Sequence, residues 1–199
     1  MSKRPAIGCL FEVVETLVLT LIIFLVIQTF IAQPYRVEQQ SMEQTLEPDQ
    51  YVLVDKLTPR FDPYKRGDIV VFNPPDDWVQ PDGTPFIKRV IAVAGDTLEI
   101  KDDGFVYVNG IRLDEPYVYK EADGSTQPTV SSTDPPHWQI PDGELFVMGD
   151  HREKSSDSRT FGPISNGDVI GRAWLRYWPF DTFGILQTPK HPELQAANP

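Results

Sequence analysis

The clearest strand in this 199-residue sequence is the run Phe86-Ile87-Lys88-Arg89-Val90-Ile91-Ala92-Val93-Ala94-Gly95-Asp96. Its aromatic and β-branched side chains suit a buried strand. A lysine there is unusual, because lysine is rarely buried unless it is paired. Taken alone, Lys88 is best interpreted as a strand-edge residue whose stem lies on apolar surface while its ammonium reaches water. If Lys88 is buried, its pKa is lowered and its neutral amine becomes a possible general base.

The chain on both sides of this run is also typical of β structure. Short apolar segments recur at 51–54, 68–72, 97–100, 105–108, 144–148 and 168–175. Asp102-Asp103-Gly104 and Asn109-Gly110 lie between or after such segments and predict hairpins. No helical period of useful length follows residue 50. We therefore expect an all-β domain, either a barrel-like, complex sheet or a sandwich, preceded by one N-terminal transmembrane helix.

The predicted transmembrane helix lies at the N-terminus. Residues 16–27 are apolar apart from threonines, and the run from Val13 to Ala32 reaches the ~20 residues that span a membrane. A cleaved signal peptide is the alternative, but a cut after Ala32 would place bulky Phe30 where a small residue is needed. A buried core helix is less favoured because the run has no amphipathic stripe. We expect an N-terminal segment at 1–12, an anchor at 13–32, a β domain at 33–180 with an extended insertion at 114–140, and a loose tail at 181–199.

Charge indicates the orientation and excludes one class of partner. Lys3 and Arg4 precede the span, and Arg36 is the only basic residue that follows it closely. Basic residues favour the cytoplasmic side, so we expect a single-pass protein of the cell membrane with a cytoplasmic N-terminus and an extracytoplasmic β domain. The net charge of −11 falls entirely after residue 40, which argues against nucleic acid as a partner. No metal-ligand spacing or phosphate-binding glycine loop is present, so we expect no metal and no cofactor.

Two further segments contain polar groups that suit nucleophilic catalysis. Gln39-Gln40-Ser41-Met42-Glu43-Gln44-Thr45-Leu46 follows the anchor and offers one serine among apolar residues. Gly149-Asp150-His151-Arg152-Glu153-Lys154-Ser155-Ser156-Asp157-Ser158-Arg159 is dense in small polar side chains. Taken separately, the first is typical of a cap or turn and the second of a surface loop. Together with Lys88 they could form one site, because a nucleophilic serine needs a base and the base needs an orienting group.

Each of these groups has a possible role in such a site. Ser41 is the candidate nucleophile and Lys88 the candidate base, with Ser155 holding the lysine amine. Asp157 and Arg159 are expected to form an ion pair that fixes the loop, since a guanidinium group can form bidentate hydrogen bonds to a carboxylate.

A Ser-His-Asp triad based on His151 is the mechanistic alternative. The other histidines, His137 and His191, fall in the expected insertion and tail.

In this order behind an anchor, the segments resemble the type I signal peptidase family. These enzymes are membrane-anchored Ser-Lys endopeptidases that remove signal peptides from exported proteins. Residues 41–46 are similar to the family's Ser-Met-x-Pro-Thr-Leu, and residues 86–96 to its apolar pair, Lys-Arg and apolar run ending in Gly-Asp. Residues 149–162 are similar to its third motif, with His151 in place of Asn. Residues 66–72 resemble its Gly-Asp strand.

The resemblance covers about residues 1–178 and implies a function. It implies a β-rich catalytic domain in which neutral Lys88 activates Ser41 at the membrane surface. Its partners would be signal peptides of exported preproteins and membrane lipid. The cleft would admit only small side chains just before the cut and two residues further upstream. The positions that match this cleft are Val37, Met42, Leu46, Phe86 and Ile87.

Two departures from the family pattern bear on activity. Gln44 replaces the usual proline after the nucleophile. Gln39 stands where some members carry a serine that helps to stabilise the oxyanion. Either the Gln39 amide or the backbone N–H of Ser41 alone would then serve, and loss of one such donor can cost ~2.7–4 kcal/mol. The alternative function is a catalytically weak or inactive, membrane-tethered peptide-binding β domain of the same descent.

Overall fold

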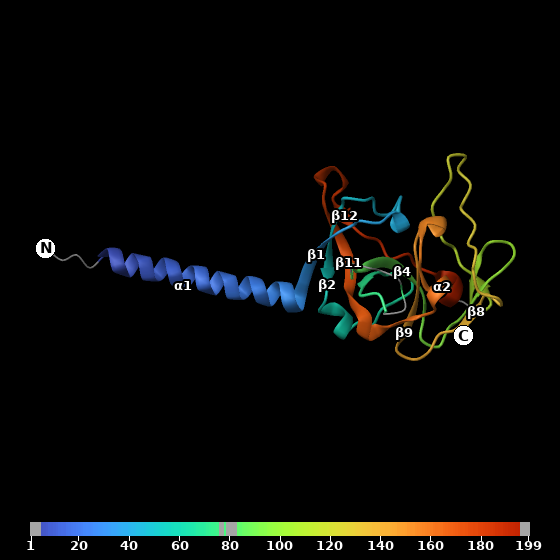
Figure 1. Ribbon diagram of the computed structural model, residues 1–199, viewed down its shortest axis with the longest axis horizontal. Helices are drawn as coiled ribbons and strands as arrows, with labels where there is room; N and C mark the ends of the chain where they lie inside the picture. The colour runs from blue at the N-terminus through green and yellow to red at the C-terminus, as the bar shows by residue number, and fades with distance from the viewer. Residues whose placement is uncertain (1–4, 76–77, 79–82, 196–199) are drawn as a thin grey trace.

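A single apolar helix projects from a β domain (Figure 1). The computed structural model describes residues 5–75, 78 and 83–195. Helix α1 spans Pro5–Val26 and continues as a π-helical turn, η1, at Ile27–Ile31. The segment Leu10–Ile31 has a mean hydropathy of 2.6 and none of it is buried, so it is long and apolar enough to cross a membrane. Lys3 and Arg4, on which the predicted orientation depends, lie outside the described residues.

Two antiparallel sheets form the β domain, which confirms the predicted all-β fold with one N-terminal helix. The first sheet curls into a half-barrel with the strand order β1-β2-β11-β3-β4-β9-β10, and β12 pairs with β11. Its strands are β1 Ala32–Arg36, β2 Tyr51–Asp55, β3 Ile69–Phe72, β4 Phe86–Val93, β9 Glu144–Met148, β10 Ile164–Ser165, β11 Val169–Trp178 and β12 Gly184–Ile185.

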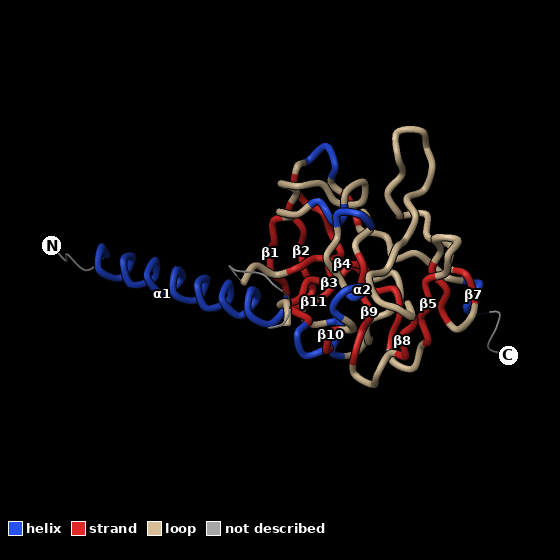
Figure 2. The backbone as a smooth tube through the Cα atoms, turned by 45° about the vertical axis from the view of Figure 1, so that its right-hand side comes forward, coloured by secondary structure: helices blue, strands red, loops and turns tan. Residues whose placement is uncertain are grey.

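The second sheet lies at the end of the domain away from α1, with the order β7-β6-β5-β8 (Figure 2). Its strands are β5 Thr97–Ile100, β6 Val106–Val108, β7 Ile111–Arg112 and β8 His137–Gln139. Short helical turns lie between strands of the first sheet, and one more follows the last strand. They are η2 Gln40–Met42, η3 Thr58–Arg60, η4 Arg152–Lys154, α2 Ser158–Phe161, η5 Asn166–Asp168, η6 Phe180–Thr182 and α3 Pro192–Gln195.

Strand β4 is the buried strand that its composition predicts. It pairs with β3 on one side and β9 on the other, and every residue from Phe86 to Ala92 is buried. Phe86 and Val90 pack in one hydrophobic cluster, whereas Ile87 packs in another. Because the strand is covered on both faces, Lys88 has no route to solvent along its own strand, and its side chain is only 1% exposed.

The two predicted turns form the hairpins of the second sheet. Strands β5 and β6 pair with Leu98 opposite Val108, and the turn between them contains Gly104 at φ +78°. Asn109 and Gly110 connect β6 to β7 with φ values of 54° and 78°. Two successive positive φ values are what an Asn-Gly hairpin turn requires.

The segments expected to be an extended insertion and a loose tail are more ordered than the sequence indicates. Residues 114–140 include β8 and an isolated bridge between Lys120 and Thr126. In the C-terminal segment, β12 pairs with β11, and Thr188 Oγ1 donates a hydrogen bond to Asp68 Oδ1 at 3.0 Å. These segments lack internal periodicity because their order depends on partners far away in the sequence.

Candidate active site

The candidate nucleophile Ser41 lies in the single-turn helix η2, directly after β1. Its side chain is 1% exposed, and neighbouring Met42 is fully buried. Met42 and Leu46 belong to the same hydrophobic cluster as Val37, and Leu46 N donates to Met42 O at 2.7 Å. These apolar side chains therefore fix the turn to the core, so the position of the Ser41 hydroxyl is set by packing on both sides of it.

The candidate base Lys88 contacts this hydroxyl. Lys88 Nζ donates a hydrogen bond to Ser41 Oγ at 2.6 Å, within the buried interior. Burial lowers the pKa of Lys88 from 10.5 to about 8; the carboxylates of Asp157 and Asp150 oppose this shift, and the Arg159 guanidinium adds to it. Desolvation dominates because an ammonium ion loses its hydration in the core. The structure thus places a lysine with a lowered pKa within hydrogen-bonding distance of a serine.

Asp157 organises the 149–159 loop, and its charge acts on the lysine. It is 1% exposed, and its side chain accepts a hydrogen bond from Arg159 N, which caps α2. Arg159 Nε donates to Asp157 Oδ1 at 2.8 Å, so the expected ion pair is present. Arg159 also donates to the backbone oxygens of Arg152 and Val130. Burial raises the pKa of Asp157, but the Arg159 guanidinium and the hydrogen bonds from Ser155 and Gly149 outweigh it, so the pKa is lowered.

Ser155 lies beside the site, but its hydrogen bonds differ from those the sequence suggests. Its hydroxyl donates to Asp157 Oδ2 at 2.6 Å and accepts from Gly149 N–H at 3.2 Å. Within the described part of the chain, the hydrogen bonds include none between Ser155 and Lys88. A Cβ at Gly149 would collide with Ser155 Oγ and with the carbonyl oxygen of Ser41. Ser155 therefore packs against the backbone beside the nucleophile. Among the described residues, no hydrogen bond supports the expectation that Ser155 holds the Lys88 amine.

A buried ion pair that sequence reasoning missed links all three segments. Arg89 donates to both carboxylate oxygens of Asp150, at 2.8 and 2.6 Å, and both side chains are almost fully buried. Thr45 Oγ1 donates to Asp150 Oδ2 at 2.6 Å. The nucleophile segment, β4 and the 149–159 loop thus meet at one carboxylate. The only sequence signal was the presence of these residues inside the three motifs.

His151, the alternative base, is occupied elsewhere. Its Nδ1 lies 2.6 Å from Glu43 Oε2, and its ring stacks on Tyr119 at 3.9 Å between centroids. Its backbone N–H donates to the carbonyl oxygen of Ser41 at 3.0 Å. Among the residues that the structure describes, its ring makes no hydrogen bond to the Ser41 hydroxyl. His151 therefore supports the nucleophile turn through its backbone and Glu43.

Gln44 has a conformation that the family's proline cannot adopt. Its φ is 70°, whereas proline is fixed near −65°. Its side-chain amide donates to Lys120 O at 2.8 Å and accepts from Lys120 N–H at 3.0 Å. The substitution thus attaches the nucleophile turn to the 114–140 segment, and the turn is held by two hydrogen bonds rather than by a proline ring.

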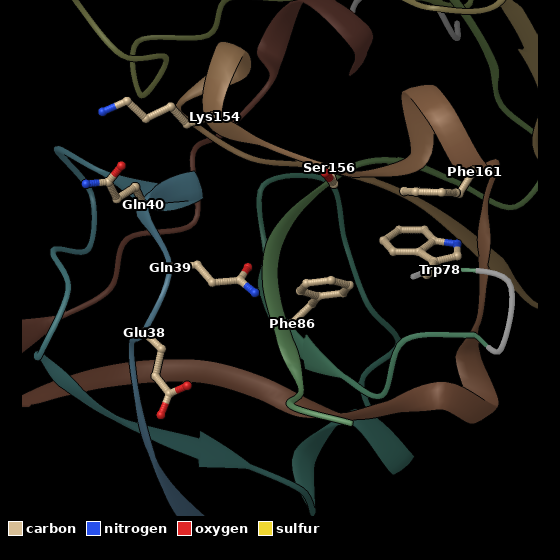
Figure 3. Close-up of a pocket in the computed structure, with 8 residues that line it drawn as sticks. All are labelled: Glu38, Gln39, Gln40, Trp78, Phe86, Lys154, Ser156 and Phe161. Atoms are coloured by element: carbon tan, nitrogen blue, oxygen red, sulfur yellow. The ribbon is translucent and has the colours of Figure 1, made fainter. Parts of the chain in front are cut away.

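Two cavities are lined by residues that adjoin Ser41 and Lys88 in the sequence. The larger, of about 530 Å³, contains the Gln39 side chain, which extends toward Phe86 (Figure 3). The smaller, of about 20 Å³, is lined by Val37 and Ile87 among others. Met42 and Leu46, also expected to line the substrate cleft, line neither cavity and are fully buried.

Known proteins resemble this chain along most of its length. A model of the signal peptidase family, peptidase S26, matches residues 10–178. Signal peptidase I of Leptolyngbya laminosa is 34% identical over 191 residues, which cover 94% of this chain and 89% of the relative. A probable signal peptidase I of a Synechocystis species is 35% identical over 179 residues, 88% of this chain and 86% of the relative. Signal peptidase IB of Staphylococcus aureus is 35% identical over 193 residues, 92% of this chain and 96% of the relative. The chain therefore belongs to the signal peptidase family, peptidase S26, whose members are serine endopeptidases that remove signal peptides from preproteins.

Proposed function

We propose that this chain removes N-terminal signal peptides from exported preproteins at the outer face of the membrane, with Ser41 as nucleophile and Lys88 as general base. The observation that carries this proposal is the buried 2.6 Å contact between Lys88 Nζ and Ser41 Oγ. With a pKa of about 8, about a tenth of Lys88 is neutral at pH 7, compared with about 0.03% for an unperturbed lysine. Burial thus raises the population of the base several-hundredfold.

The reaction proceeds in two halves at these two atoms. Neutral Lys88 Nζ takes the proton from Ser41 Oγ while Oγ attacks the scissile carbonyl carbon. The C–N bond then breaks, Lys88 returns that proton to the leaving amine, and an ester remains on Ser41. Lys88 next takes a proton from water as the water oxygen attacks the ester, and passes it to Ser41 Oγ when the signal peptide leaves. The oxyanion is stabilised by the backbone N–H of Ser41, by the Gln39 amide, or by both.

The surrounding residues hold this pair in place. Asp157 and Arg159 form an ion pair in the 149–159 loop, and their charges act in opposite directions on the pKa of Lys88. Ser155 acts as a positioning residue through Asp157 and Gly149. The ring of His151 bonds to Glu43, which favours Lys88 over His151 as the base.

The smaller of the two cavities supports selection by steric exclusion. The cavity of about 20 Å³ lined by Val37 and Ile87 has room for little more than a methyl group. A substrate with a small side chain at that point enters, whereas a bulky one does not. Phe86 lines the larger cavity, whereas Met42 and Leu46 pack in the hydrophobic core next to the nucleophile.

The anchor supports a site at the membrane surface. Lys56 N donates to the carbonyl oxygen of Ile31, the last residue of the helical segment, at 2.9 Å, so the β domain is attached directly to the end of the span. Exposed aromatic side chains outside the anchor, including Phe61 at 81% and Phe180 at 75%, are suited to contact with lipid. With a cytoplasmic N-terminus, this arrangement brings the site to the outer surface, where a translocated signal peptide emerges.

Cleavage of a preprotein by the full chain in detergent tests the proposal. We expect Ser41→Ala and Lys88→Met each to lower kcat/KM by at least about a thousandfold, since members of a catalytic pair act as a unit. His151→Asn should lower kcat/KM less than about tenfold. If Lys88→Met stays active while His151→Asn is inactive, His151 is the base and the proposal is wrong. If a serine-directed acylating probe fails to label Ser41 although signal peptide still binds, the chain is a binding module.

A further inference from the structure

The larger cavity has an aromatic wall and a polar wall (Figure 3). On the aromatic side, Trp78 and Phe161 stack with 5.0 Å between ring centroids, and Trp78 lies 5.7 Å from the ring of Phe86. On the polar side are Glu38, Gln39, Gln40 and Lys154, and Ser156 lies between the two sides. Aromatic faces of this kind bind apolar side chains well.

Residues on both sides of the proposed dyad line this cavity, although Ser41 and Lys88 themselves are not among its lining residues. Gln40 immediately precedes Ser41 in the turn η2. Phe86 lines the cavity, and the centroid of its ring lies 5.1 Å from Lys88 Nζ. A peptide whose carbonyl is attacked by Ser41 therefore has residues within reach of the cavity, since an extended chain advances about 3.3 Å per residue.

Size indicates which end of the substrate the cavity receives. The proposed cleavage specificity requires exclusion of large side chains before the cut, and the cavity of about 20 Å³ supplies it. A cavity of about 530 Å³ excludes no side chain. Glu38 and Gln39 line both cavities, so the two lie along one segment of the chain and a single extended substrate can pass both.

We propose that the larger cavity binds the first two residues after the cleaved bond, and that its aromatic wall favours a large apolar side chain there. This inference rests on the proposed dyad. It makes Trp78 and Phe161 specificity-determining residues, and it assigns the cavity to the mature end of the preprotein. The smaller cavity receives one small side chain of the signal peptide, on the other side of the cut.

Ser156→Trp tests the inference with little risk to the fold, because Ser156 is exposed and its new side chain would fill the cavity. Glu153→Trp, exposed in the same loop but outside the cavity, is the matched control. Two substrates share one signal-side sequence. One is a peptide with Phe and Leu after the cut, and the other ends at the cut in a methyl thioester. The measured quantity is the ratio of kcat/KM for the peptide to kcat/KM for the thioester, in the full chain in detergent.

We expect Ser156→Trp to lower this ratio at least tenfold and Glu153→Trp to change it less than twofold. In the unmodified chain, a peptide with Phe after the cut should be cleaved severalfold faster than one with Gly. A ratio that Ser156→Trp leaves within twofold of the parent overturns the inference while the proposed function stands. If the unmodified chain hydrolyses neither substrate, or if Ser41→Ala hydrolyses the thioester as fast as the parent, the proposed function itself fails and this inference fails with it.

Discussion

Replacing Lys88 with methionine should stabilise the protein at neutral pH while it abolishes cleavage. Methionine has a similar length and no charge, so it fills the buried space without the cost of desolvating an ammonium ion. In the folded protein the pKa of Lys88 falls from 10.5 to about 8, mainly because the side chain is buried. Each pKa unit is worth about 1.4 kcal/mol, so the unfavourable contribution of the charged lysine to folding is roughly 3 kcal/mol.

The pH dependence of this effect has a definite sign. Between about pH 8 and pH 10.5 the unfolded chain keeps the Lys88 proton that the folded protein has lost. The parent therefore gains stability as the pH rises through this window. Below pH 8 the free energy of unfolding of Lys88→Met should exceed that of the parent by the largest amount. This difference, the stability margin, should shrink by about 3 kcal/mol by pH 10.5. Differences in packing between the two side chains do not depend on pH and cancel from this change.

Urea unfolding of the full chain in detergent, followed by tryptophan fluorescence between pH 6.5 and pH 10.5, measures the margin. Lys154→Met is a suitable control because Lys154 is exposed. For this control the margin should stay nearly constant with pH. The reasoning is refuted if the Lys88→Met margin is also constant, because Lys88 would then titrate alike in the folded and unfolded chains.

Four further predictions follow from the site. First, kcat/KM should rise with pH and level off above about 8, because only neutral Lys88 accepts the serine proton; a profile already flat at pH 6 would exclude Lys88 as the base. Second, Gln44→Pro should lower kcat/KM at least about tenfold and Gln44→Gly much less, because glycine adopts the φ of 70° readily whereas proline cannot; equal activities would show that this conformation is unimportant. Third, His151→Asn should lower kcat/KM less than about tenfold in the same assay, because the backbone N–H that holds the nucleophile turn remains; a thousandfold loss would contradict this role. Fourth, Asp157→Asn should cost about 3–5 kcal/mol in urea unfolding at pH 7, because Arg159 is left buried without its counter-charge. Since the folded-state pKa of Asp157 is lowered, the parent keeps this stabilisation above the carboxyl's unfolded pKa and loses it as the pH falls through the folded value, so the difference should narrow in acid.

Much of the fold could be predicted because its central strands carry their own signals. The apolar run around Lys88, the short β-branched segments and the Asn109-Gly110 turn each depend on neighbours in sequence. Strand β1 was missed because Ala32–Arg36 contains Pro34 and polar residues, and its pairing with β2 depends on the register Ala32↔Asp55. Strand β8 was missed for a similar reason, since His137–Gln139 is ordered by pairing with β5.

The site was predicted less completely than the fold. Motif order brought Ser41 and Lys88 into one hypothesis, and the structure places them in contact. The hydrogen bonds of Gln44 to Lys120 and of His151 to Glu43 could not be foreseen, because each joins residues more than seventy positions apart. Such partners leave no local pattern of hydrophobicity or spacing in the sequence.

A titration of the Lys88 amine tests the central claim most directly. Lysine labelled with ¹³C at Cε gives a resonance for each side chain, and Lys88→Met identifies the one that belongs to Lys88. We predict a midpoint near pH 8 for Lys88 in the folded protein, equal to the pH at which acylation of Ser41 reaches half its maximum rate. A Lys88 midpoint above about 10, where an ordinary lysine titrates, would contradict the proposed dyad.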